Sequence, residues 1–231
     1  MLKVLDSAVP VSCWSCSVAH NESTLFCPDC SKIQPPSSGD YFSVFGLTPR
    51  LNIDLSALEQ EFHRLSRRLH PDRFARASEN EKEWSLADTA LLNDAYRTLK
   101  DPLRRTEYLL KLEGAEMGAV AAPDKDRKNP SRVPADLLEE VFDLNMQLEE
   151  MRMAKKLGQE DPELKESLRK AKEKFEGLVA AVDRDLRAQW AIWDVGDAAA
   201  RQTAQRAMIA LIDRRKYLSN LVRDVTEILG D

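Results

Sequence analysis

The sequence has few of the residues on which β-rich, secreted or membrane proteins depend. Only 8 of its 231 residues are glycine and 6% are aromatic. No cysteine follows residue 30, so disulfide bonds cannot hold the body of the chain together. No apolar run approaches the roughly 20 residues of a membrane-spanning helix. The first twelve residues have no apolar core and no Arg/Ser-rich pattern, so we expect no signal or transit peptide in them.

Charged residues, in contrast, make up 32% of the chain, and the formal net charge is −5. A chain of this charge binds nucleic acid only through a local basic patch. Many charges with few glycines and aromatics are typical of helical proteins. We therefore predict an all-α protein with no nucleic-acid partner and no membrane partner.

Composition divides the chain into four parts. Residues 1–38 contain the cysteines and lead into the link QPPSSGD, and residues 39–115 predict a helical domain. Residues 116–133 contain prolines, mixed charge and no period, which indicates a linker or loop. Residues 134–231 predict three long amphipathic helices with short connections, which favours an antiparallel three-helix bundle.

Capping signals place the helices of both domains. Asp54 and the sequence SENE at 78–81 each predict a helix start, and Pro71 stops the first of these two helices. Asp101–Pro102, Asp161–Pro162 and Gly196–Asp197 mark further starts and breaks. The apolar stripes expected to face the core begin with Leu55, Leu58, Phe62, Leu65 and Leu69, then Trp84, Ala87, Leu91, Ala95 and Leu99, and in the bundle Leu137, Val141, Leu144, Leu148 and Met151.

The cysteines form two C-x2-C pairs separated by ten residues, at Cys13, Cys16, Cys27 and Cys30. Two such turns supply the four soft ligands of a tetrahedral structural zinc site. Two disulfides or one redox pair are the alternatives, but one redox pair leaves the second unexplained. His20 is a further possible ligand, although four cysteines already complete the shell. We expect zinc to replace the core that so short a segment lacks.

The sequence RRLHPDRFAR at 67–76 surrounds a His-Pro-Asp tripeptide with arginines. The tripeptide is either a surface turn that ends a helix, a catalytic His/Asp pair, or a docking loop. Catalysis fits poorly, because side chains that flank a proline tend to diverge and no nucleophile is evident nearby. A local excess of arginine in an acidic chain indicates attraction to an acidic partner surface.

Three motifs in this region resemble a J domain: YFSVFGL at 41–47, LHPDRF at 69–74 and NDAYRTLKDPLRRTEYLL at 93–110. The resemblance implies that a helical hairpin presents His70, Pro71 and Asp72 to a DnaK-type chaperone and stimulates its ATP hydrolysis. Asp72 would pair with a cationic group of the chaperone, while His70 and Pro71 hold the loop. The arginines that would meet its acidic surface are Arg64, Arg67, Arg68 and Arg73. The family usually has Tyr and Lys where this chain has Leu69 and Arg73.

The helical continuation of residues 40–231 resembles the HscB family of iron–sulfur cluster co-chaperones. The resemblance implies an HscA/DnaK-type ATPase and an IscU-type scaffold as partners, and no catalytic activity in the chain itself. The expected scaffold-binding residues are Leu137, Leu138, Val141, Phe142 and Tyr217. Helical spacing places Leu138, Phe142 and Tyr217 off the core stripes, whereas it assigns Leu137 and Val141 to the core. Packing against the other domain, or simple exposure, is the alternative.

The leading cysteine segment resembles the form of this family found in animal mitochondria. The expected location is the bacterial cytoplasm, or the mitochondrial matrix for a processed eukaryotic chain. A J-domain co-chaperone for another client and a zinc or thiol redox protein are the alternative functions.

Overall fold

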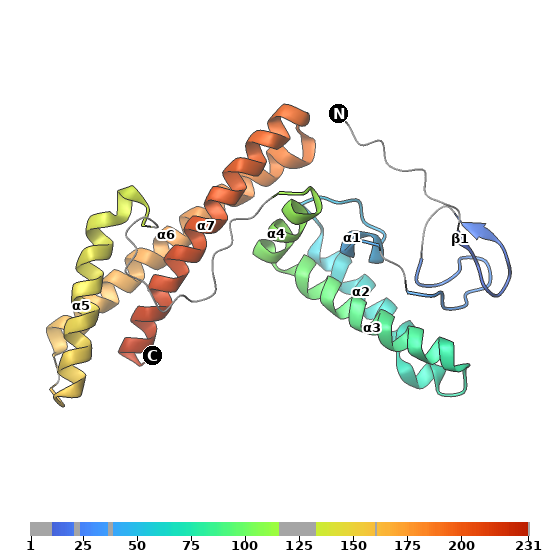
Figure 1. The fold of residues 1–231 in the computed structure, drawn as a ribbon, viewed down its shortest axis with the longest axis horizontal. Coiled ribbons are helices and arrows are strands. Elements are labelled where there is room, and N and C mark those ends of the chain that lie inside the picture. Colours follow the sequence, from blue (N-terminus) through green and yellow to red (C-terminus); the bar gives the residue numbers. More distant parts are fainter. Residues whose placement is uncertain (1–10, 21–23, 37–38, 116–132, 160, 231) are drawn as a thin grey trace. The chain divides into compact units, whose positions relative to one another are not determined.

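The computed structural model describes residues 11–20, 24–36, 39–115, 133–159 and 161–230. The chain divides into two compact units, Met1–Leu112 and Glu113–Asp231. The described residues contain seven α-helices, and their only named strands are a two-residue pair in the cysteine segment (Figure 1). The all-α prediction is therefore confirmed. The predicted linker at 116–133 falls almost entirely outside the described residues, and the four domain boundaries stay predictions.

The first unit begins with the cysteine segment. There β1 (Val11–Ser12) pairs antiparallel with β2 (Ala19–His20). The helical part follows, with a 3-10 turn between its two main helices, which pack against each other. Its elements are α1 (Tyr41–Val44), α2 (Leu55–Leu69), the turn η1 (Pro71–Phe74), α3 (Glu79–Lys100) and α4 (Pro102–Leu112).

The predicted helix starts in this unit are confirmed. The Asp54 carboxylate accepts hydrogen bonds from the backbone of Ser56 and Ala57 at the start of α2. Ser78 and Glu81 form a complete capping box at the start of α3. The Asp101 carboxylate accepts from the amide of Arg104, 2.7 Å away, just ahead of α4.

The buried face of α3 differs from the predicted one. Ala95 and Leu99 are buried as expected, but Ala87 is exposed and Trp84 is only half-buried. The core instead takes Leu92 and a set of polar side chains: Glu81, Ser85 and Asp88. Ser85 explains part of this rotation, because its hydroxyl donates a hydrogen bond to the backbone at the end of α2.

Aromatic contacts connect the first and last helices of this unit. The rings of Tyr41 and Tyr108 stack with their centroids 4.4 Å apart, and the Tyr108 hydroxyl accepts a hydrogen bond from the Tyr41 amide. Phe42 is fully buried beside them. Two of the motifs that carried the resemblance thus pack together: YFSVFGL and the end of NDAYRTLKDPLRRTEYLL, which contains Tyr108.

The second unit consists of a 3-10 turn and three helices. These are η3 (Ala135–Leu137), α5 (Leu138–Lys156), α6 (Pro162–Val195) and α7 (Ala198–Leu229). Asp161 and Asp197 cap α6 and α7 as predicted. With 34 and 32 residues, α6 and α7 form a hairpin much longer than the 19-residue α5.

The core of the bundle contains every residue of the predicted α5 stripe. Leu137, Val141 and Leu144 are each under 5% exposed. From α6 and α7 the same cluster takes Leu164, Leu168, Phe175, Val182, Leu218, Leu221, Val225, Ile228 and Leu229. Within the described residues, no helix combines the length and apolar character needed to cross a bilayer.

Candidate functional site

The His-Pro-Asp tripeptide lies at the junction of α2 and η1. The Asp72 amide donates to His70 Nδ1 over 3.3 Å, and Asp72 Oδ2 lies 3.6 Å from the same nitrogen. The expectation that these side chains diverge was therefore wrong, because the 3-10 turn brings the third residue back toward the first. His70 and Asp72 are 59% and 90% exposed, so the pair is a surface feature and not an enclosed site.

The arginines of this region have different environments. Arg64 forms a bidentate ion pair with Glu61, and the hydrogen bonds from Arg64 lower the pKa of the Glu61 carboxyl. Arg67 and Arg73 are exposed. The guanidinium of Arg68 instead lies over the ring of Phe26, 3.9 Å from its centroid, and desolvation lowers the pKa of Arg68. Of the four predicted docking arginines, two are thus already engaged within the chain.

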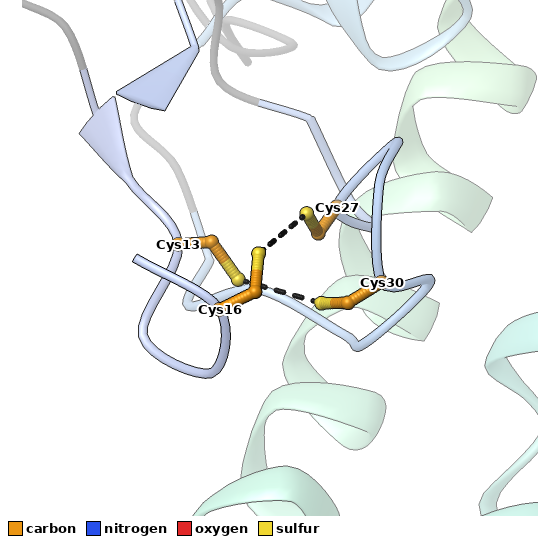
Figure 2. A group of neighbouring side chains, drawn as sticks. All are labelled: Cys13, Cys16, Cys27 and Cys30. Atoms are coloured by element: carbon orange, nitrogen blue, oxygen red, sulfur yellow. Dashed lines mark hydrogen bonds between the residues drawn. The ribbon is translucent and has the colours of Figure 1, made fainter. Parts of the chain in front are cut away.

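The four cysteines converge from two loops (Figure 2). Cys13 Sγ lies 3.6 Å from Cys30 Sγ, Cys16 Sγ lies 3.7 Å from Cys27 Sγ, and all four sulfurs lie within 4.8 Å of one another. A tetrahedral site with metal–sulfur bonds of about 2.3 Å places its sulfurs roughly 3.8 Å apart. A disulfide requires about 2.05 Å, and all four are free thiols. The geometry therefore fits one metal ion and excludes the two-disulfide alternative for this arrangement.

The two C-x2-C turns have the same backbone construction. Ser17 and Ser31, the residues that follow the second cysteine of each pair, have left-handed φ angles of 63° and 60°. Their amides donate to the carbonyls of Cys13 and Cys27, each over 2.9 Å. One loop geometry is therefore built twice, and each copy points two thiols at a common centre.

Hydrogen bonds around the centre favour a thiolate at Cys13 and disfavour one at Cys16. The Ser15 amide and Gln34 Nε2 approach Cys13 Sγ at 3.4 and 3.5 Å. Burial raises the pKa of Cys13, but hydrogen bonds from backbone amides, Cys16 first and Ser15 next, outweigh it and bring the pKa to about 6. At Cys16 an amide hydrogen bond from Val18 lowers the pKa, but burial and the neighbouring thiols raise it to about 12. All four cysteines could be thiolates at this separation only with a cation between them.

His20 lies beside this centre and not in it. Its Nε2 is 3.4 Å from Cys27 Sγ and 3.3 Å from Asp29 Oδ2. His20, Cys27 and Asp29 form a second group close enough to hold a metal. Because the four cysteines complete a tetrahedral shell, His20 is placed to hold the Cys27 sulfur as an outer partner.

The predicted scaffold-binding residues fall into two sets. Leu138 and Phe142 are 54% and 64% exposed on α5, whereas Leu137 and Val141 are buried in the bundle core. Tyr217 on α7 is partly buried and packs against that core, so the expectation that it has no place there was wrong. Leu138 and Phe142 are thus the accessible members of the set.

Three further apolar residues of the same face were missed in the sequence. Met146, Met153 and Leu157 are 59%, 61% and 70% exposed. At 3.6 residues per turn they share a sector of about 100° with Leu138 and Phe142. We call these five residues the α5 apolar stripe. Helical spacing applied to the whole length of α5 would have found it.

Comparisons with known proteins support the resemblance. No family model matches the chain. A curated co-chaperone protein HscB homolog of Vibrio cholerae is 51% identical over 80 residues, which is 35% of this chain and 47% of that protein. The human iron–sulfur cluster co-chaperone protein HscB is 35% identical over 142 residues, 60% of this chain and 57% of that one. The chain thus spans about half the length of the curated relatives it matches.

Solved structures align over more of the chain. The structure of chaperone HscB from Vibrio cholerae is 30% identical, with a TM-score of 0.57 over 82% of this chain and 97% of its own. That of human co-chaperone protein HscB is 25% identical, with a TM-score of 0.65 over 94% and 98%. Because this chain is 30% identical to the Vibrio cholerae structure and covers 97% of it, the chain belongs to the HscB family of co-chaperones.

Proposed function

We propose that this chain stimulates ATP hydrolysis by an HscA/DnaK-type chaperone and delivers an IscU-type iron–sulfur scaffold protein to it. The observation that carries the proposal is the exposed His-Pro-Asp loop between two capped, packed helices in a chain of the HscB family. The chain itself carries out no chemistry in this proposal, and the ATPase hydrolyses the nucleotide.

The loop acts by binding one state of the chaperone more tightly than another. Asp72, which is 90% exposed, offers its carboxylate to a cation on the chaperone. Arg67 and Arg73 flank it as exposed cations that meet acidic surface. Arg64 and Arg68 are already engaged with Glu61 and Phe26, so we assign them smaller contributions than Arg67 and Arg73.

The α5 apolar stripe supports the assignment of the scaffold surface. Leu138 and Phe142 lie at its start, and the two methionines at 146 and 153 supply flexible, polarisable side chains suited to an irregular partner. Leu137 and Val141 contribute by holding α5 in place, because both are buried. Tyr217 contributes through the part of its ring that stays accessible.

The metal in this proposal is structural zinc, held by Cys13, Cys16, Cys27 and Cys30. When bound, zinc supplies a cross-link between the two cysteine loops and leaves no open position for a substrate. A site closed by four cysteines also fits a reducing compartment, the bacterial cytoplasm or the mitochondrial matrix.

Steady-state ATPase turnover of the cognate chaperone, with this protein and the scaffold added separately and together, tests the proposal. We expect stimulation by this protein that increases when the scaffold is present. His70→Gln should abolish stimulation and leave the melting temperature unchanged, because His70 is exposed. Stimulation that survives His70→Gln contradicts the docking role. Stimulation of the same size with and without the scaffold favours a J-domain co-chaperone for another client.

A further inference from the structure

Three side chains of the cysteine segment contact the hairpin that carries the His-Pro-Asp loop. The ring of Trp14 meets Trp84 of α3 edge-on, with centroids 5.7 Å apart and planes at 64°. Lys32 Nζ lies 3.0 Å from Glu81 Oε1 of α3. The third contact is that of Phe26 with Arg68 of α2. One small segment therefore touches both helices of the hairpin.

Each of the three contact residues is tied to the metal centre through the chain. Trp14 follows Cys13, Phe26 precedes Cys27, and Lys32 comes two residues after Cys30. Trp14 Nε1 also donates a 2.7 Å hydrogen bond to the carbonyl of Ile33. The described part of the segment buries Cys13, Cys27, Ile33 and Gln34 and so has almost no apolar core of its own. The positions of the three residues thus depend on the four-cysteine centre.

Lys32 completes the polar cap of α3. Glu81 is only 7% exposed, and its Oε2 accepts hydrogen bonds from the amide and hydroxyl of Ser78. Its Oε1 faces Lys32, and the hydrogen bond from Lys32 is the main reason that the pKa of Glu81 is lowered. Without Lys32 a buried carboxylate would lose its cation, which weakens the first turn of α3.

The contacts lie on both sides of the docking loop. Arg68 is in the last turn of α2, two residues before His70. Glu81 and Trp84 are in the first turns of α3, where the chain leaves the loop. When both ends of a loop are held in place, the residues between them have fewer accessible conformations. The segment is therefore placed to restrict the loop from both of its ends.

We propose that Trp14, Phe26 and Lys32 are positioning residues for the His-Pro-Asp loop. The metal-bound cysteine segment holds the last turn of α2 and the first turn of α3, and in this way it keeps the loop in the conformation that docks the ATPase. The positioning effect stands on the structure of this unit alone, whereas its consequence for docking rests on the proposed function.

The test compares zinc-loaded, full-length wild-type protein with Lys32→Ala, Trp14→Ala and Lys32→Arg. Ser15→Ala is the matched control, since Ser15 is exposed on the same cysteine turn as Trp14. All of these variants keep the four cysteines. Zinc content is measured first to show that each of them still binds the metal. Hydrogen exchange is then followed at residues 70–84 and, as an internal reference, in α6 and α7. The concentration of each protein that gives half-maximal ATPase stimulation is measured separately from the maximal stimulation.

We expect Lys32→Ala and Trp14→Ala to speed exchange at residues 70–84 several-fold at unchanged zinc content, with no change in α6 and α7. Both should raise the half-maximal concentration and leave the maximal stimulation nearly intact, while Lys32→Arg and Ser15→Ala behave like wild type. Unfolding of the whole chain would instead speed exchange in α6 and α7 as well.

Equal exchange at residues 70–84 in all zinc-loaded variants would overturn the positioning role. Faster exchange with an unchanged half-maximal concentration would overturn its link to docking. If wild type itself fails to stimulate the ATPase, the proposed function fails, and the exchange measurement still decides the positioning role.

Discussion

The Ser85 hydroxyl on α3 donates a 2.6 Å hydrogen bond to the backbone carbonyl of Leu69, the last residue of α2. Carbonyls at the end of a helix have no partner within the helix. Both residues are fully buried, so water cannot take the place of the hydroxyl. This bond ties the two helices together immediately before the His-Pro-Asp loop.

We expect Ser85→Ala to destabilise the first unit by about 1–3 kcal/mol, because it leaves a buried carbonyl short of a donor. Thr89, whose hydroxyl is 3.4 Å from the same carbonyl, limits the loss to the lower part of that range. Hydrogen exchange of α2 and α3 in the full chain measures the change. Ser56→Ala, at an exposed site of α2, is the control and should change little. Equal stability of the two variants would show that the bond contributes nothing.

Asp88 predicts a dependence of stability on pH. Its side chain is fully buried, and neither carboxylate oxygen has a hydrogen-bond partner within the described residues. Burial raises the pKa of Asp88 to about 7, whereas an unfolded aspartate titrates near 3.9. Between about pH 4 and pH 7 the unfolded chain releases this proton and the folded chain keeps it, so stability falls as the pH rises.

Asp88→Asn should remove that decrease and stabilise the first unit at pH 8 by at least about 1 kcal/mol, since no charge is then buried. Urea unfolding at several pH values between 4 and 8 measures the effect. Asp94→Asn on the same helix is the control, because its ion pair with Arg97 is exposed and worth only tenths of a kcal/mol. Parallel pH profiles for wild type and Asp88→Asn would contradict the prediction.

The α5 apolar stripe predicts which changes affect binding and which affect stability. Leu138→Ala and Phe142→Ala should each weaken scaffold binding by about tenfold and hardly change the melting temperature, because both side chains are exposed. Leu144→Ala should instead destabilise the bundle by about 2–5 kcal/mol, since Leu144 is 2% exposed. Tyr217→Ala should both weaken scaffold binding and destabilise the bundle. Titration calorimetry with the scaffold and thermal unfolding separate the two effects.

Unchanged affinity in a Leu138→Ala/Phe142→Ala double variant would contradict the assignment of this face to the scaffold. ATPase stimulation by this double variant is measured as well. If stimulation persists, the docking loop is intact, and unchanged affinity then shows only that the scaffold surface was assigned to the wrong face.

Some features of the fold could be predicted because they depend on residues close together in the chain. Asp54, Ser78 and Asp161 each satisfy backbone amides two or three residues ahead, so the helix starts followed from local sequence. The spacing of the four cysteines likewise predicted a centre that two short loops can form alone. The buried residues of α5 were predicted correctly because they recur at helical spacing on one face: Leu137, Val141, Leu144, Leu148 and Met151.

The buried face of α3 could not be predicted in this way. Trp84 and Leu91 lie about as well on an apolar stripe as the residues that are buried, and periodicity does not rank two neighbouring faces. The choice was made by the end of α2, which needs the Ser85 hydroxyl, and by the cysteine segment, which covers part of Trp84. A second contact of the cysteine segment, that of Phe26 with the Arg68 guanidinium, means that Arg68 is not a free cation.

The sequence by itself determined the starts of the main helices, the group of four cysteines and the resemblance to the HscB family, and it is the basis on which we propose docking for the His-Pro-Asp tripeptide. Only the tertiary structure decided which arginines stay free, which apolar residues of α5 stay exposed, and where the cysteine segment packs. The reason is the range of the interactions involved. Helix caps and ligand spacing act over a few residues, whereas Lys32 and Glu81 meet across 49 positions of the chain. Contacts of that range depend on how the whole unit packs, which no local pattern records.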